Sequence, residues 1–217
     1  MCVPSGNFGN IYAGFLARSM GVPIRRLILA TNENNVLEEF FTTGVYRPRS
    51  ASDTLATSSP SMDISKASNL ERFIWALLGP EAFVQRWAEL EATGTLDLHD
   101  HLPRLGEEFG FVAGTSSHAD RLEAIRTVEE RSGRLIDPHT ADGVTVALRT
   151  MEPGFPTLIM ETANAAKFPQ TVAEALGGEP ETPDVVAELL ALPQKVEMID
   201  SDEAPLRALI EARALGS

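Results

Sequence analysis

The stretch Pro4-Ser5-Gly6-Asn7-Phe8-Gly9-Asn10 decides how this chain is interpreted. The apolar pair Cys2-Val3 precedes it, and residues 11–20 follow as an expected helix that ends at Gly21. A polar turn with two glycines between a strand and a helix leaves backbone N–H groups unpaired, and the helix dipole adds partial positive charge there. The stretch therefore predicts a binding site for a phosphate or carboxylate, and an ordinary strand-to-helix connection is the alternative.

Composition bounds the class of protein. The 217 residues are enough for one large or two small domains, and with 43% hydrophobic residues the chain can bury a core. The single cysteine excludes an internal disulfide framework and suits a reducing cytoplasm, where we expect the protein. The formal net charge of −13 disfavours nucleic acid or an anionic membrane as a partner. No apolar run reaches membrane-spanning length.

The first part of the chain has an α/β pattern. Residues 24–30 form a short apolar run that predicts a buried parallel strand, which with the preceding helix gives half of a doubly wound sheet. The polar cluster at residues 31–35 follows that strand, where open α/β sheets bind ligands; capping of the next helix, residues 36–42, is the alternative. Residues 45–67 have no clean period and predict a long loop.

We expect three regions: residues 1–66 as an α/β phosphate-binding region, residues 67–132 as an all-helical insertion, and residues 133–217 as an α/β continuation with carboxy-terminal helices. In the insertion, Ser68 and Glu71 have the spacing of a capping box. Helices are predicted at residues 70–78, 80–93, 101–109 and 118–132, then at 144–151, 168–176, 185–192 and 204–215. Short strands are predicted at 157–160 and 196–199, and a linker at 177–180.

Residues 5–10 resemble the pyridoxal-phosphate (PLP) phosphate-binding loop of threonine synthases. Later stretches resemble the same family in the same order: Thr31-Asn32-Glu33-Asn34, Ser59-Pro60-Ser61-Met62-Asp63-Ile64, Asp137-Pro138-His139-Thr140-Ala141, and Glu161-Thr162-Ala163 with Lys167-Phe168. The chain is therefore similar to PLP-dependent threonine synthases of fold type II, the tryptophan synthase β-like family. The resemblance implies an open parallel α/β sheet flanked by helices, with residues 67–132 as the helical insertion of one subgroup.

The resemblance also implies site residues. Backbone N–H groups of Gly6, Asn7, Phe8, Gly9 and Asn10 would bind the cofactor phosphate. Thr162 would face the pyridine nitrogen of the cofactor, and a helix N-cap is the alternative role for this residue. A hydroxyl cannot keep that nitrogen protonated as an aspartate would, which suits elimination and replacement reactions. The chain departs from the family at Asn164-Ala165, where His-Pro is common.

Three other features have alternative interpretations. Arg72 is either a contact to a substrate phosphate or a surface ion pair. His139 is an acid or base by type, but a structural or substrate-orienting role is favoured, because in PLP chemistry the Schiff-base lysine usually moves the protons. The cluster at residues 97–101 contains two aspartates and two histidines, but His-x-His does not place two ligands on one helical face. We therefore expect no metal site.

The resemblance implies that the Schiff-base lysine lies ahead of the phosphate loop, whereas the lysines of this chain are at positions 66, 167 and 195. We therefore expect the carboxy-terminal part of a longer enzyme, with no catalytic residue of its own and with the missing amino-terminal part as its partner. The intact enzyme would convert O-phospho-L-homoserine and water to L-threonine and phosphate. The alternatives are another fold-type II PLP lyase or synthase, and a non-catalytic α/β module that binds an anion.

Overall fold

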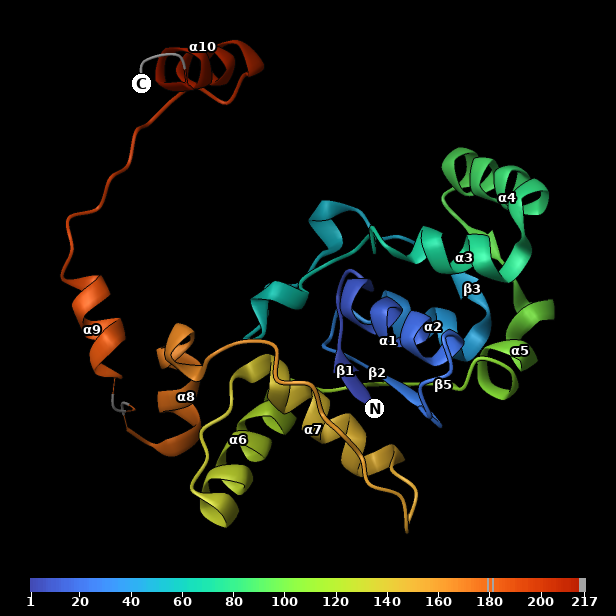
Figure 1. Cartoon of the computed structure of the whole chain (residues 1–217), viewed down its shortest axis with the longest axis horizontal. Coiled ribbons are helices and arrows are strands. Elements are labelled where there is room, and N and C mark those ends of the chain that lie inside the picture. Colours follow the sequence, from blue (N-terminus) through green and yellow to red (C-terminus); the bar gives the residue numbers. More distant parts are fainter. Residues whose placement is uncertain (179, 181, 215–217) are drawn as a thin grey trace. The chain divides into compact units, whose positions relative to one another are not determined.

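The computed structural model describes residues 1–178, 180 and 182–214 (Figure 1). The chain divides into two compact units, Met1–Glu181 and Thr182–Ser217. The first unit contains the sheet and all the residues of the candidate site. Among the described helices, none combines the length and apolar character needed to cross a membrane.

Three parallel strands form the central sheet. They are β1 (Cys2–Pro4), β2 (Leu27–Thr31) and β5 (Phe111–Thr115), in the order β1-β2-β5. Val3 lies opposite Leu29, and Leu29 lies opposite Ala113. Every residue of β1 and β2 is buried, as expected for strands covered on both faces. Because the strands are parallel, the segments that follow β1 and β2 leave the same end of the sheet.

Alternate residues of β2 pack against two helical layers. Leu27 and Leu29 belong to the core that includes residues of α1 (Gly9–Ser19) and α2 (Val36–Thr43), whereas Ile28 and Ala30 pack with residues of α7 (Pro138–Thr150). This period of two places helices on both faces of the sheet. Figure 1 shows α1 and α2 on one side of the sheet and α7 on the other.

The larger core is rich in phenylalanine. The rings of Phe8, Phe41, Phe73 and Phe111 have centroids 4.5–5.8 Å apart. They come from the loop after β1, from α2, from α3 (Leu70–Leu78) and from β5. The phosphate-loop candidate is therefore joined to the sheet and to two helices through one aromatic side chain.

The first unit contains further helices and a second, two-stranded sheet. Between α2 and β5 lie β3 (Val45–Tyr46), α4 (Pro80–Thr93), β4 (Leu96–Asp97) and α5 (Leu102–Glu107), with β3 and β4 paired antiparallel. Single 3₁₀ turns lie at Ala51–Asp53, Pro60–Met62, His99–His101 and Ala165–Lys167. Helices α6 (His118–Ser132), α7 and α8 (Pro169–Leu176) share a smaller core. The second unit contains α9 (Asp184–Leu190) and α10 (Glu203–Ala214), neither with a buried residue among those described.

Much of the predicted architecture is confirmed. The parallel sheet flanked by helices is present, and α2, α4 and α6 end at Gly44, Gly94 and Gly133, each with φ between 65° and 78°. The boundaries at residues 66/67 and 132/133 stay predictions. Glu179 of the predicted linker and Leu215 of the last predicted helix lie outside the described residues.

The expectation that residues 67–132 are all helical is wrong. They contain β4 and also β5, which pairs with β2 along five residues. The strand signal is weak because β5 contains Gly114, where an added Cβ would lie 2.9 Å from Val146 Cγ1 of α7. Close packing of a helix on the sheet requires the glycine, although glycine is a poor strand former.

Four smaller expectations are also corrected. Helix α7 begins at Pro138 rather than residue 144, because Asp137 caps it and proline is favoured in a first helical turn. The N-cap of α3 is Asn69 without a side-chain capping bond, so the predicted capping box of Ser68 does not form. Residues 157–160 make only an isolated bridge, between Ile159 and Cys2, and residues 196–199 form no strand.

Candidate functional site

The loop between β1 and α1 is held in a strained conformation by its phenylalanine. Phe8 has a φ of 69°, and within the described part of the chain it is the one non-glycine residue with positive φ. That conformation costs a non-glycine residue about 1–2 kcal/mol. The Phe8 side chain is fully buried in the aromatic core, which contributes about 1.5–3 kcal/mol. Burial therefore offsets the strain and fixes the loop.

The loop presents free backbone donors at the start of α1. Over the described residues, the N–H groups of Gly6, Asn7, Phe8 and Asn10 have no acceptor. The N–H of Gly9 donates to Asn7 Oδ1 at 3.0 Å, so this residue shapes the turn. Unpaired N–H groups at a helix N-terminus attract an anion through hydrogen bonds and through the helix dipole.

A cavity of about 220 Å³ lies beside this loop. Its lining residues come from four separate segments of the chain: Pro4, Ser5, Gly6, Asn7, Asn10, Ser61, Met62, His139, Thr162 and Ala163. The loop and Thr162 therefore line one cavity, although they are far apart in the sequence. Phe8 and Gly9 do not line it, and the side chain of Phe8 lies in the core.

Ser5 is a candidate that sequence reasoning missed. Its hydroxyl is buried in the cavity wall and has no hydrogen-bond partner among the described residues. A buried polar group without a partner costs about 1–3 kcal/mol. The sequence feature that could have identified Ser5 is its position as a hydroxyl residue directly before Gly6.

The polar residues after β2 hold the 55–63 loop, which supplies Ser61 and Met62 to the cavity. Asn32 Nδ2 and Asn34 Nδ2 each lie 2.9 Å from Asp63 Oδ1. Two stretches that were interpreted separately in the sequence therefore form one hydrogen-bonded network. Capping of α2 by a side chain of this cluster does not occur, because its N-cap residue Asn35 makes no side-chain capping bond.

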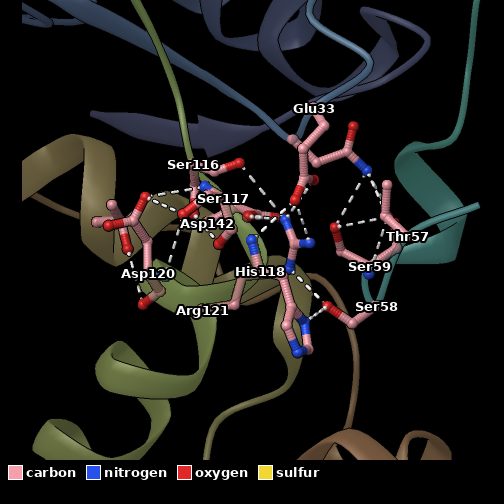
Figure 2. Close-up of polar contacts among 12 residues, drawn as sticks. Glu33, Thr57, Ser58, Ser59, Ser116, Ser117, His118, Asp120, Arg121 and Asp142 are labelled. Carbon is pink, nitrogen blue, oxygen red and sulfur yellow. Dashed lines mark hydrogen bonds and ion pairs between the residues drawn. The ribbon is translucent and has the colours of Figure 1, made fainter. Parts of the chain in front are cut away.

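A buried ion cluster holds the other side of the 55–63 loop (Figure 2). Arg121 of α6 is fully buried and donates to both carboxylate oxygens of Glu33 at 2.9 Å and to Asp142 Oδ1 at 3.1 Å. Its Nε donates to Ser58 Oγ at 2.8 Å, and that oxygen lies 2.8 Å from His118 Nδ1. A second cavity, of about 410 Å³, is lined by Glu33, Ser58, His118 and Arg121 but not by Asp142.

The two carboxylates on Arg121 differ in their electrostatics. Burial raises the pKa of Asp142 to about 6, against the opposing effect of Arg121. Burial also raises the pKa of Glu33, but the hydrogen bonds from Arg121 and the backbone outweigh it and hold that pKa below its ordinary value. Burial accounts for much of the difference, since the Glu33 side chain is 29% exposed and that of Asp142 is fully buried with no partner for Oδ2 among the described residues.

His139 is fixed through both ring nitrogens. Its Nδ1 lies 2.8 Å from Asp137 Oδ1, and its Nε2 accepts the N–H of Ser61 at 3.0 Å. Because Nε2 is an acceptor, we assign the proton to Nδ1 and a neutral ring. Burial raises the pKa of Asp137, but hydrogen bonds from His139 and Thr140 outweigh it and hold that pKa below its ordinary value. This geometry favours the orienting interpretation of His139 over an acid or base role.

Thr162 is tied to the cavity through its backbone. Its N–H donates to Thr140 Oγ1 at 3.4 Å. The turn that follows is capped by Asn164, whose side chain accepts the N–H of Ala166 at 2.9 Å. The N-cap alternative for Thr162 is therefore wrong. Its hydroxyl makes no hydrogen bond within the described residues, which leaves it available to a ligand.

Comparison with known proteins identifies the family. A family model described as "Threonine synthase, C-terminal" matches residues 140–210. Threonine synthase of Methylobacillus glycogenes is 51% identical over 212 residues, which cover 96% of this chain and 44% of that protein. The chain belongs to the threonine synthase family.

Further threonine synthases agree in sequence and structure. The enzyme of Corynebacterium glutamicum is 49% identical over 215 residues, with 96% of this chain and 44% of that protein covered. The crystal structure of PLP-bound threonine synthase from Brucella melitensis matches with a TM-score of 0.88 and 33% identity over 97% of this chain and 45% of that one. The crystal structure of yeast threonine synthase matches with a TM-score of 0.87 and 30% identity, over 100% of this chain and 47% of that one. The chain thus spans somewhat under half the length of these threonine synthases.

The other candidate residues do not line the cavity beside the loop between β1 and α1. Arg72 lines a different cavity, with Tyr12 and Trp75. His99 is exposed and lies within hydrogen-bond distance of Asp97. Within the described ranges, no group of three or more acidic, histidine or cysteine side chains is arranged to hold a metal ion. The cavity lining includes no lysine.

Proposed function

We propose that this chain is the carboxy-terminal, cofactor-binding part of a threonine synthase that acts in the cytoplasm. In the complete enzyme it would take part in the conversion of O-phospho-L-homoserine and water to L-threonine and phosphate. Membership of the threonine synthase family supports this reaction. The PLP-bound relative with a TM-score of 0.88 supports PLP as the cofactor.

One observation carries the proposal: free backbone donors and Thr162 line a single cavity. The N–H groups of Gly6, Asn7 and Asn10 would bind the cofactor phosphate, with Phe8 contributing its N–H and Gly9 the shape of the turn. The hydroxyl of Thr162 would meet the ring nitrogen as a neutral partner. The unpaired hydroxyl of Ser5 fits an additional hydrogen bond to the same ligand.

The electrostatics of the cavity fit a phosphate bound through amides. The chain has a formal net charge of −13, and no cationic side chain lines the cavity within the described residues. Positive potential must therefore come from the backbone N–H groups and the α1 dipole. When bound, PLP supplies an electron sink for elimination and replacement at an amino acid. The Schiff-base lysine would come from the missing amino-terminal part of the enzyme.

A ligand titration of the purified chain tests whether the loop between β1 and α1 binds a phosphate group. We expect PLP and inorganic phosphate to bind and pyridoxal, which lacks the phosphate, to bind at least tenfold more weakly than PLP. Ser5→Ala should weaken PLP binding while leaving the melting temperature unchanged or raised, because the variant removes an unsatisfied buried hydroxyl. Ser19→Ala is the matched control, since Ser19 only donates to its own helix at Phe15.

A fusion tests the reaction. The part of the Methylobacillus glycogenes enzyme that precedes the matched region would be joined to this chain, and phosphate release from O-phospho-L-homoserine would be measured. Turnover with threonine as the product supports the proposal. Turnover of serine or threonine instead would identify another fold-type II enzyme. Absence of PLP and phosphate binding by both the fusion and the chain would favour a non-catalytic module.

A further inference from the structure

We propose that Asp137 is the positioning residue of the cavity: its carboxylate fixes His139 and Thr140, and through them two walls formed by the 55–63 loop and by Thr162. The inference rests on the proposed function only for the identity of the ligand. Asp137 itself is fully buried and does not line the cavity. It would therefore act through other residues, and touches neither substrate nor cofactor.

The Asp137 carboxylate is at the centre of a compact set of donors. Its Oδ1 accepts the backbone N–H of His139 at 2.9 Å and lies 2.8 Å from His139 Nδ1. The N–H of Thr140 reaches Oδ1 at 3.4 Å, and the Thr140 hydroxyl donates to Oδ2. Two backbone and two side-chain donors therefore converge on one carboxylate, a geometry that favours its charged form.

One branch of this network leads to the 55–63 loop. Since Asp137 accepts a hydrogen bond from His139 Nδ1–H, Nε2 carries no proton and accepts the N–H of Ser61. Ser61 and the neighbouring Met62 both line the cavity. Met62 Cα lies 2.9 Å from where a Cβ on Gly6 would stand, so this wall is packed directly on the phosphate-loop candidate. The tautomer of His139 thus determines whether the wall is held.

The second branch leads to Thr162. The Thr140 hydroxyl donates its proton to a hydrogen bond with Asp137. The lone pairs of Thr140 Oγ1 can therefore accept the N–H of Thr162, at 3.4 Å. Thr162 is the residue whose hydroxyl would face the cofactor ring. The two branches leave from adjacent residues in the first turn of α7, so one carboxylate sets the separation of two walls that are distant in sequence.

A capping role alone does not account for this arrangement. Ser117, which caps α6, makes its capping bonds only with Asp120 in the first turn of its own helix. Asp137 also caps its helix, but its carboxylate accepts two further hydrogen bonds, from the side chains of His139 and Thr140. Both of these side chains connect to cavity walls. Serine and asparagine cap helices about as well as aspartate. Substitution by either residue therefore separates the cap from the positioning role.

The experiment compares the full chain with Asp137→Ser, Asp137→Asn and the control Ser117→Asn. Nitrogen-15 NMR of the imidazole rings reports the tautomer, and the His139 signal is assigned with a His139→Gln variant. We expect wild-type His139 to carry its proton on Nδ1 with no ligand present. Both Asp137 variants should fold and bind PLP about tenfold more weakly, because misplaced walls cost binding energy. Asp137→Ser should also lose the single tautomer, whereas Asp137→Asn keeps an oxygen that can accept from His139 Nδ1 and loses only the acceptor of the Thr140 hydroxyl. The control should change neither the tautomer nor PLP binding.

The outcomes separate the two proposals. If wild-type His139 carries its proton on Nε2, or if both Asp137 variants keep the Nδ1 tautomer and the wild-type PLP affinity, Asp137 is not the positioning residue. If the wild type binds neither PLP nor phosphate, the proposed function fails, while the tautomer measured without ligand still decides the role of Asp137. If both variants fail to fold, the wild-type tautomer decides alone.

Discussion

Asp137, the N-cap of α7, and Asp142 inside that helix are both completely buried, but their pKa values shift in opposite directions. Asp137 accepts hydrogen bonds from His139 and Thr140, and its pKa lies below the ordinary value. Asp142 has Arg121 on one oxygen and no partner on the other among the described residues, and burial raises its pKa to about 6. Hydrogen bonds therefore outweigh desolvation at Asp137, whereas desolvation outweighs the attraction of Arg121 at Asp142.

The largest expected effect comes from removing the cation beside Asp142. Arg121→Met leaves Glu33 and Asp142 without their shared guanidinium, and loss of one partner from a buried pair costs about 3–5 kcal/mol. Urea denaturation measures the free energy of unfolding. Arg47→Met is the control, because Arg47 is 58% exposed in its ion pair with Glu39 and should cost under about 1 kcal/mol. Equal costs for the two variants would contradict a structural role for the cluster.

The pH dependence of unfolding distinguishes the two aspartates. With a folded pKa of about 6 against an ordinary value of 3.8, Asp142 keeps its proton in the folded chain where the unfolded chain has lost it. Its contribution to stability is therefore full below pH 3.8 and is lost as the pH rises through 6. Relative to Asp142→Asn, the wild type should lose about 3 kcal/mol between pH 3.5 and pH 7.

The contribution of Asp137 to stability changes with pH in the opposite direction. Its folded pKa is lowered, so its contribution is present above the ordinary value of 3.8 and is lost as the pH falls below it. This contribution is common to the wild type and Asp142→Asn, so it cancels in their difference. If the difference in unfolding free energy between the two proteins stays constant from pH 3.5 to pH 7, the pKa of Asp142 is not raised in the folded chain.

Local sequence signals predict the parts of the fold that depend on neighbouring residues. The end of α2 at Gly44 follows from a glycine with a φ of 78°, a conformation that is a property of the residue itself. β5 was missed because Gly114 is present for the approach of Val146, a residue far along the chain. A tertiary contact therefore overrides the propensity that sequence reasoning relies on.

The same distinction applies to the candidate site. The loop and Thr162 were predicted from motifs, and they line one cavity. The roles of Arg121 and Asp137 were not predicted, because the first depends on Glu33 and the second on contacts with distant walls. Arg121 has no local pattern that distinguishes it from an ordinary helix residue, and the motif that contains Asp137 does not show which walls His139 and Thr140 contact.

Removal of the Asp137 side chain should have an intermediate effect. Asp137→Ala deletes the cap of α7 and leaves the side chains of His139 and Thr140 without their acceptor, which we expect to cost about 2–3 kcal/mol. Ser117→Ala removes a cap that serves only its own helix and should cost about 1 kcal/mol. Thermal and urea unfolding of both variants measure the difference. Equal costs would mean that the side-chain donors add nothing to the cap.

The smallest effects should come from the threonines at the end of the Asp137 network. Thr140→Val removes a buried hydroxyl that connects Asp137 to the backbone of Thr162, so we expect a loss of about 1 kcal/mol. Thr162→Val removes an exposed hydroxyl and should change the free energy of unfolding by less than about 0.5 kcal/mol. With PLP present the order should reverse, because only the Thr162 hydroxyl would contact the ligand. Unfolding measured with and without PLP therefore separates the structural role of Thr140 from the ligand-binding role of Thr162. If the order of the two variants in unfolding free energy is the same with and without PLP, Thr162 does not belong to the site.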